Sequence, residues 1–271
     1  MVHGRNTVNT RVKEVLEIER EKLKKLIEVL EGEIPEKQYN QILMCINDEI
    51  MKQAGEIRKK FNCKSRYCPI CSNKLKLKEQ RKMRKKLEEA KEKNYLLMTL
   101  NGNNVTEENL KHEIEDNNRA FTSLMRLEQF KRVVTGYIKT VEITYINEKS
   151  TYLPHLHIIL LVKSSYRKYI KLNSDKADIM EQWNRQKKSH GLFADIQSVR
   201  DIEKVMGYLT VSQKKRYTEI GQEELKGIIR SIRNKKRLYS YGGILSQKVT
   251  KNATKQSNHL RLQNFDNKEV I

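Results

Sequence analysis

Apolar residues recur at helical spacing along the first part of the chain. Between residues 11 and 31 they predict an amphipathic helix, which Gly32 and Pro35 end. A second helix is predicted from Glu36 to Gln53. Each helix has one apolar face, which must pack against the remainder of the chain or against a second copy of it. The pattern leaves both options open, so a homo-oligomer is one expectation.

From Tyr95 onward, short β-type runs alternate with helical ones. A very basic helix is predicted just before this change, over residues 74–93, and the turn-like Asn147–Ser150 separates two of the later strands. The predicted elements are strands at residues 95–100, 136–146, 154–162 and 193–198, and helices at residues 106–131, 175–186 and 201–213. Strands that are covered by helices predict an α+β fold.

These changes of pattern divide the chain into three parts. Residues 1–93 contain the N-terminal helices, a cysteine-rich segment and the basic helix. Residues 94–245 form the α+β domain. Residues 246–271 are polar and rich in Lys, Asn and Gln, a composition that predicts a disordered tail.

The net charge of the chain is +21, from 55 Lys and Arg against 34 Asp and Glu. Such an excess favours nucleic acid over an anionic membrane surface as the partner, because each neutralised phosphate releases condensed counterions. No run of about 18 apolar residues is present, so no membrane-spanning segment is predicted. Residues 1–10 lack the apolar core of a signal peptide. We therefore expect a cytoplasmic protein with no membrane partner.

Three cysteines lie close together in the sequence at Cys63, Cys68 and Cys71. Thiolates at this spacing can surround Zn²⁺ tetrahedrally, and a structural zinc site needs four protein ligands. Cys45, the remaining cysteine, is the candidate for the fourth ligand. The alternative is that Cys45 is a small buried helix residue and that water or a histidine completes the site. A full thiolate shell leaves no open position for chemistry, so this zinc would be structural.

Two histidines, His155 and His157, lie on either side of Leu156 in a predicted strand. Side chains at i and i+2 of a strand face the same way, so the two imidazoles can bind one divalent cation together. The alternative is a solvent-facing strand that binds no metal. Glu142 lies on the preceding predicted strand and would add a carboxylate ligand if the two strands pair. It is otherwise an exposed glutamate.

Five motifs in this order resemble the rolling-circle replication initiators of small Gram-positive plasmids, a branch of the HUH endonucleases. The resemblance covers roughly residues 40–245. The motifs are the cysteines at residues 63–71, Leu96-Leu-Met-Thr-Leu100, the two strands over residues 136–145 and 153–160, Val205-Met-Gly-Tyr208, and Arg237-Leu-Tyr-Ser-Tyr-Gly-Gly-Ile244.

The resemblance implies a five-stranded antiparallel sheet with the histidine pair on a central strand. It also implies an enzyme that binds a plasmid origin and nicks one strand where the DNA is single-stranded. Tyr208 falls at the position of the family's nucleophile, with Tyr217 and Tyr239 as the other candidates. Mg²⁺ or Mn²⁺ held by the histidines and Glu142 would assist the attack. The products are a 3′ hydroxyl that primes replication and a 5′ phosphotyrosine that permits later rejoining. A host helicase is a further expected partner.

The sequence departs from the family around the tyrosine. Many relatives have a glutamate four residues before it, which activates water for termination, but this position is Lys204. Glu203 precedes it and is the alternative candidate for that role. Lys204 lies one helical turn from Tyr208, where it could favour the phenolate or bind phosphate, or it could be a solvated surface lysine. Val211 replaces a lysine that is often found after the tyrosine.

Two other functions compete with the plasmid initiator. A single-tyrosine transposase or relaxase of the same superfamily would share the chemistry but act on another substrate; the cysteine motif and Gly242-Gly243 favour the initiator. A non-catalytic, zinc-containing DNA-binding protein would explain the charge and the cysteines. It would leave the histidine pair, Glu142 and Tyr208 without a role.

Overall fold

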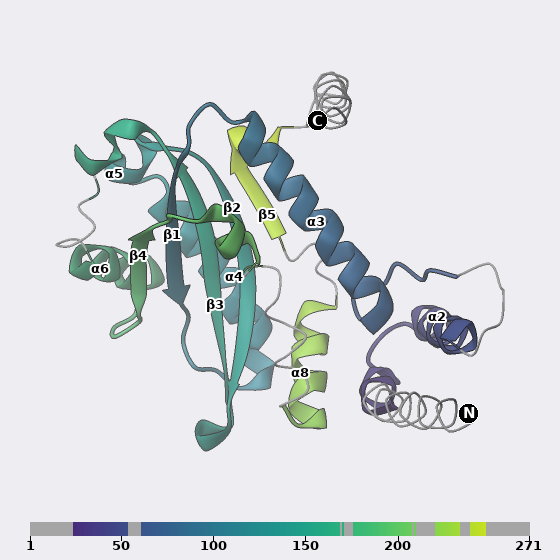
Figure 1. Cartoon of the computed structure of the whole chain (residues 1–271). Coiled ribbons are helices and arrows are strands. Elements are labelled where there is room, and N and C mark those ends of the chain that lie inside the picture. Colours follow the sequence, from purple (N-terminus) through teal and green to yellow (C-terminus); the bar gives the residue numbers. More distant parts are fainter. Residues whose placement is uncertain are drawn as a thin grey trace, which may run out of the picture.

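A five-stranded antiparallel sheet organises the chain, with helices on both of its faces (Figure 1). The computed structural model describes residues 24–53, 61–168, 170, 176–207, 209, 220–233 and 239–247. The following residues lie outside this description: residues 1–23, the tail from residue 248, and Tyr208 with residues 210–213 of the helix predicted over residues 201–213.

The strands are arranged in the order β4-β1-β3-β2-β5, and each neighbouring pair is antiparallel. Their bounds are β1 Asn94–Asn101, β2 Val134–Ile146, β3 Thr151–Val162, β4 Ala194–Ser198 and β5 Tyr239–Gly243. The histidine-bearing strand β3 is central, and the two edge strands have five residues each. This arrangement confirms the α+β fold and the antiparallel sheet that the resemblance implied.

The predicted helices agree with the structure in part: α8 was not predicted, α3 begins earlier than predicted, and the chain turns inside one predicted helix. Their bounds are α2 Glu36–Gln53, α3 Pro69–Glu89, α4 Glu107–Leu124, α5 Glu128–Lys131, α6 Lys176–Lys187 and α8 Gln222–Ile232. The helix predicted over residues 106–131 is wrong as one unit. It ends at Leu124, and Leu127 has an extended backbone, so the chain changes direction and buries Phe130.

The basic helix α3 begins five residues before its predicted start, at Pro69. Cys68 precedes it as the N-cap, and its sulfur accepts a hydrogen bond from the Cys71 N–H. A proline at the first helical position has no N–H to leave unsatisfied, so it suits this start. The cysteine motif and the beginning of α3 are therefore one structural unit.

The side chains of β3 alternate between two apolar layers. Leu156, Ile158 and Leu160 pack into a core with α4 and α6, in which Phe121 and Trp183 are fully buried. On the opposite face, a second core contains Ile159 and Leu161 of β3, Met83 and Leu87 of α3, and Met206 and Leu209. The histidines belong to this second face because they alternate with Leu156.

Two glycines shape the edge of the sheet at β5. Gly242 lies opposite Tyr137 of β2, and a Cβ atom at Gly242 would come within 2.0 Å of that ring. Gly243 has a φ of +57°, a left-handed conformation that glycine adopts at little cost. The Gly-Gly pair therefore permits a strand where the sequence pattern alone predicts none.

The N-terminal helices pack against the rest of the chain through α8. Leu30 and Ile42 share a core with Leu225 and Ile229 of α8, and Figure 1 shows α8 between the sheet and α2. Arg230 of α8 donates to Glu33 over 2.7 Å from its Nε and to Glu107 of α4 over 2.8 Å from its Nη1. Intramolecular packing thus accounts for these apolar faces within the described residues. No helix in the described ranges is both long and apolar enough to cross a membrane.

We predict that Leu160→Ala lowers the free energy of unfolding by about 2–5 kcal/mol, because it opens a cavity in the central strand. Leu77→Ala makes the same chemical change at an exposed position of α3 and should cost less than about 0.5 kcal/mol. Urea unfolding followed by circular dichroism measures both. Equal losses in the two variants would contradict the assignment of the core.

Candidate active site and cysteine cluster

Three potential metal ligands converge on the second face of the sheet. Glu142 of β2 lies directly opposite His155 in the strand register. Its Oε2 atom is 3.3 Å from His155 Nε2 and 2.7 Å from His157 Nε2. The two imidazole rings are perpendicular, with centroids 4.8 Å apart. The structure therefore brings together the three residues that the sequence proposed for the catalytic metal, here called the His–Glu cluster.

The His–Glu cluster is shielded from bulk water. The exposed fractions are 8% for His155, 5% for His157 and 2% for Glu142. Burial alone would raise the pKa of the Glu142 carboxyl, but hydrogen bonds from both imidazoles hold this pKa well below its ordinary value. A carboxylate kept ionised in a buried place attracts a cation strongly.

Contacts to the other ring nitrogens fix the orientation of both imidazoles. His157 Nδ1 lies 3.3 Å from the Thr99 hydroxyl of β1, and His155 Nδ1 lies 3.3 Å from the Leu153 carbonyl. Such outer contacts direct the Nε2 atoms toward the shared centre. Two imidazoles and one carboxylate form a mixed nitrogen and oxygen donor set, which fits a divalent cation such as Mn²⁺.

Sequence reasoning missed Thr99, although it had a detectable signal. It is the one hydroxyl in the otherwise apolar run Leu96-Leu-Met-Thr-Leu100. Its partner could not be predicted because it depends on β1 pairing with β3, which places Thr99 opposite His157.

The helical segment that contains residues 202–207 and 209 packs on the same face as the His–Glu cluster. Met206 and Leu209 are buried in the core that includes Ile159, two positions after His157. Tyr208 and Tyr217 are outside the described residues. The described neighbours on either side of Tyr208 nevertheless belong to a helix on this face.

Tyr239 is the described candidate among the competing tyrosines. It lies in β5 opposite Thr140, which in turn lies opposite His157. Burial raises the pKa of Tyr239 to about 12. A phenol that ionises less readily is a weaker nucleophile near neutral pH, so this environment disfavours Tyr239.

Glu203 and Lys204 lie on the surface of the same helical segment and do not join the His–Glu cluster. Glu203 accepts a hydrogen bond of 2.9 Å from Arg84 Nε of α3, and this ion pair lowers the pKa of its carboxyl. Lys204 is exposed, and its Nζ lies 3.8 Å from the Asp201 carboxylate. Glu203 is thus paired with α3, whereas Lys204 is exposed to solvent.

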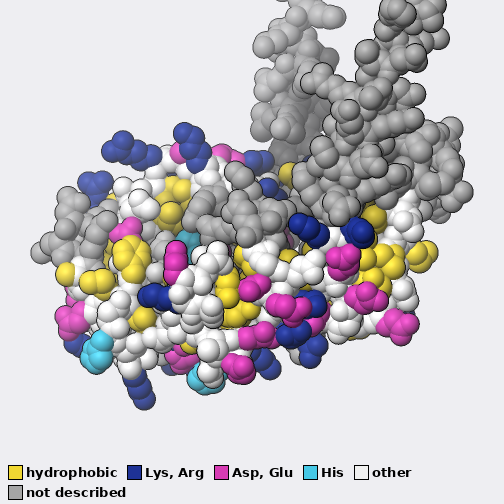
Figure 2. Space-filling view, turned by 90° about the horizontal axis from the view of Figure 1, so that it is seen from below, with side chains coloured by type: hydrophobic (Ala, Val, Ile, Leu, Met, Phe, Trp, Pro, Cys, Tyr) yellow, Lys and Arg dark blue, Asp and Glu magenta, His cyan; other side chains and the backbone are white. Residues whose placement is uncertain are grey.

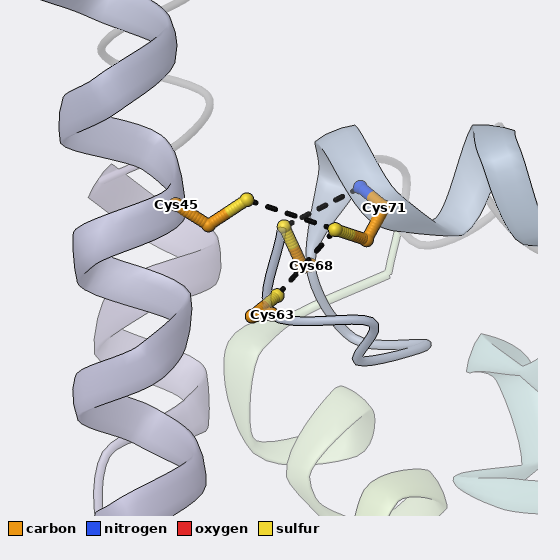
Figure 3. A group of neighbouring side chains, drawn as sticks. All are labelled: Cys45, Cys63, Cys68 and Cys71. Carbon is orange, nitrogen blue, oxygen red and sulfur yellow. Dashed lines mark hydrogen bonds between the residues drawn. The ribbon is translucent and has the colours of Figure 1, made fainter. Parts of the chain in front are cut away.

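All four cysteines of the chain meet in one group (Figure 3). Cys45 points out of α2 toward the motif at the start of α3, and its sulfur is 3.6 Å from Cys71 Sγ. Cys63 Sγ is also 3.6 Å from Cys71 Sγ, and every pair of sulfurs lies within 4.8 Å. Four thiolates around one point are the ligand set of a structural zinc site.

The thiols of this cysteine cluster differ in acidity. Burial raises the pKa of Cys45, Cys63 and Cys68 to about 11 each. Burial has the same tendency at Cys71, but hydrogen bonds from the Lys64 backbone and the neighbouring thiols lower its pKa. Ionisation of one thiol is thus tied to the hydrogen bonds that it receives from the other three.

Positive charge is spread over the surface around these sites. Lys74, Lys78 and Arg81 are exposed on α3, whereas Lys86 is buried and donates to the Leu245 carbonyl over 2.6 Å. Figure 2 shows the molecule from below, with Lys and Arg side chains interspersed among acidic and apolar ones on that face. The basic side chains of α3 provide contacts suited to a phosphate backbone.

The fold and the two ligand clusters define an α+β protein with a histidine–carboxylate site on its central strand. A family model described as "Replication protein" matches residues 54–270, and the chain belongs to this family. Membership confirms the resemblance to replication initiators of Gram-positive plasmids that the motifs indicated.

Proteins called "Protein rep" are similar to the chain along much of its length. The one from Streptococcus pneumoniae serotype 2 (strain D39 / NCTC 7466) is 28% identical over 238 residues, which cover 82% of this chain and 71% of the relative. The one from Lentilactobacillus hilgardii is 32% identical over 147 residues, 53% of this chain and 45% of the relative. The one from Staphylococcus aureus is 28% identical over 130 residues, which cover 47% of this chain and 56% of the relative. The chain thus spans about half the length of the latter two. No solved structure matches it significantly.

For the cysteine cluster, we predict a tetrahedral thiolate site. Replacing the bound metal by Co²⁺ should give an intense sulfur-to-cobalt charge-transfer band, which Cys45→Ser should weaken together with the metal affinity. Met44→Ser, at the exposed neighbouring position of α2, is the matched control and should leave the band unchanged. A band of full intensity in Cys45→Ser would show that another group supplies the fourth ligand.

For the His–Glu cluster, we predict that His157→Ala lowers the affinity for Mn²⁺ by more than about tenfold, because one of three ligands is lost. The protein is first loaded with Zn²⁺ to fill the cysteine cluster. Its affinity for Mn²⁺ is then measured from the electron paramagnetic resonance signal of free Mn²⁺. His112→Ala removes an exposed histidine of α4 and should not alter binding. Equal affinities in the two variants would exclude His157 as a ligand.

Proposed function

We propose that the chain initiates rolling-circle replication of a plasmid by nicking one strand at the origin. The observation that carries the proposal is the convergence of His155, His157 and Glu142 in a member of the replication protein family. These three residues would hold Mg²⁺ or Mn²⁺, which when bound polarises the scissile phosphate and stabilises the charge of the transition state. The same sheet face supports the helical segment around Tyr208.

Tyr208 is the proposed nucleophile. Its phenolic oxygen forms a bond to the phosphorus, and the bond between the phosphorus and the 3′ oxygen breaks. The phenolic proton passes to solvent, and the leaving 3′ oxygen takes up a proton. The products are a 5′ phosphotyrosine and a 3′ hydroxyl that a polymerase can extend. Attack by that hydroxyl on the phosphotyrosine reverses these changes and rejoins the strand.

The proposal also assigns a role to each part of the chain. Residues 94–245 form the nicking domain, and residues 1–93 form an extension that the zinc-bound cysteine cluster stabilises. Origin DNA, single-stranded at the nick, is the substrate. A host helicase, a second copy of the chain and a cytoplasmic location stay predictions. The roles of Glu203 and Lys204 in termination also stay predictions, and a role for Glu203 would require it to leave Arg84.

The competing functions are less well supported. A transposase or relaxase would use the same His–Glu cluster, but the family match favours replication over those substrates. A DNA-binding protein without catalysis would not require the ionised Glu142 carboxylate between two oriented imidazoles.

We predict a covalent adduct when the chain is incubated with Mn²⁺ and single-stranded oligonucleotides that tile a plasmid origin. A 3′ label should remain on the protein through denaturation in SDS, because the protein keeps the 5′ phosphate. A 5′ label should appear on a shortened fragment that a polymerase extends. Tyr208→Phe should abolish the adduct, and His157→Ala should slow its formation by roughly 100-fold or more.

Tyr239→Phe and His112→Ala serve as the matched controls and should form the adduct at the rate of the unaltered chain. An adduct that persists in Tyr208→Phe would refute the assigned nucleophile. A chain that binds the oligonucleotides but gives no adduct with any of them would refute nicking and favour the DNA-binding protein.

A further inference from the structure

Phe193 is an exposed aromatic residue beside the active face of the sheet. Its exposed fraction is 51%, whereas its neighbours Leu192 and Ala194 are exposed by only 8% and 3%. Both neighbours pack into the core with α4 and α6, together with Leu156 of β3. Because side chains alternate along an extended chain, Phe193 faces the opposite side. This is the side that carries His155 and His157.

The strand register places Phe193 in the same row as the His–Glu cluster. Ala194 pairs with Leu100, so Phe193 lies next to Asn101, whose N–H donates to the Phe193 carbonyl over 2.9 Å. Asn101 lies opposite His155, and His155 lies opposite Glu142. Two strand spacings separate Phe193 from His155, which is about 10 Å. A nucleotide adjacent to a phosphate at the His–Glu cluster can span this distance.

The backbone around Phe193 is held firmly on both sides. Asn184 of α6 clamps Leu192: its Oδ1 accepts from the Leu192 N–H, and its Nδ2 donates to the Leu192 carbonyl, each over 2.9 Å. Trp183 Nε1 donates to the Asn101 carbonyl over 2.7 Å. An aromatic ring on a fixed backbone loses little conformational entropy when it binds a ligand.

The surroundings of Phe193 suit a nucleobase better than a protein partner. The adjacent residues on the same face are polar and partly exposed, among them Asn101, Thr99 and Asp195. A single exposed apolar residue is common and needs no partner. Phe193 differs from such residues in two ways: its backbone is fixed, and it lies in the same cross-strand row as His155 and Glu142. Proteins that bind single strands place such aromatic rings beside the path of the backbone.

We propose that Phe193 is a stacking platform for an unpaired nucleobase that flanks the scissile phosphate. It is a positioning residue, which holds the single strand across β4, β1 and β3 so that the phosphate reaches the His–Glu cluster. This inference rests on the proposed function for the identity of its ligand, single-stranded DNA. Stacking is tolerant of sequence, so Phe193 contributes to affinity and alignment and leaves the choice of origin to other contacts.

The test uses the full chain and oligo(dT) of about 16 nucleotides at low salt. By fluorescence anisotropy, Phe193→Ala and Phe193→Leu should both bind about tenfold more weakly, whereas Phe193→Trp should bind like the unaltered chain. Phe193→Leu retains an apolar side chain, so its loss separates stacking from simple hydrophobic contact. Met180→Ala, an exposed residue of α6 on the other side of the sheet, should not change the affinity.

Tryptophan fluorescence gives a second readout that a structural role would not move. Trp183 is the only tryptophan of the chain and is fully buried, so oligo(dT) should barely change its emission. In Phe193→Trp, the added indole should be quenched on binding. An unquenched indole, unchanged affinity in Phe193→Ala, or no binding of oligo(dT) by the unaltered chain would each overturn the inference. These results would not contradict the proposed nicking if the unaltered chain still forms the covalent adduct. Conversely, stacking on Phe193 without any adduct would refute the proposed nicking but not the stacking.

Discussion

The pairing of β2 with β3 is the constraint on which the site depends. It places Glu142 opposite His155 and brings one carboxylate oxygen to both imidazoles. A shift of one residue in this register would move Glu142 to the other face of the sheet, among Phe121 and Trp183. Apolar side chains that alternate with the ligands fix the register from the opposite face. The core and the ligand cluster are therefore two faces of the same hydrogen-bonded ladder.

Features determined by local spacing could be predicted from the sequence. The alternation around Leu156 gave both histidines the same face, and the cysteine spacing identified the cluster at the start of α3. Helix α8 was missed although Leu225, Ile228, Ile229 and Ile232 follow a helical pattern. Strand β5 had no such signal, since it is short and contains two glycines. It forms because Gly242 admits the ring of Tyr137 across the strand pair.

Features that depend on packing between distant segments could not be predicted. The approach of Cys45 to Cys71 requires α2 to pack beside the start of α3, and sequence spacing does not contain that information. The surroundings of Glu203 and Lys204 are a similar case. Helical spacing placed Lys204 one turn before Tyr208 and Glu203 on a different face of the helix. It could not show that Glu203 pairs with Arg84, which lies far away in the sequence on α3.

The short edge strands also have a consequence for the behaviour of the chain in a cell. An exposed strand edge offers unpaired N–H and carbonyl groups to other chains, and a long edge is a template for aggregation. Here the edge strands β4 and β5 have only five residues each, and β5 pairs with residues 136–140 of the 13-residue strand β2. Within the described residues, the part of β2 that carries Glu142 therefore continues past its pairing with β5. Short edge strands of this kind limit the length over which another chain can add a strand to β4 or β5.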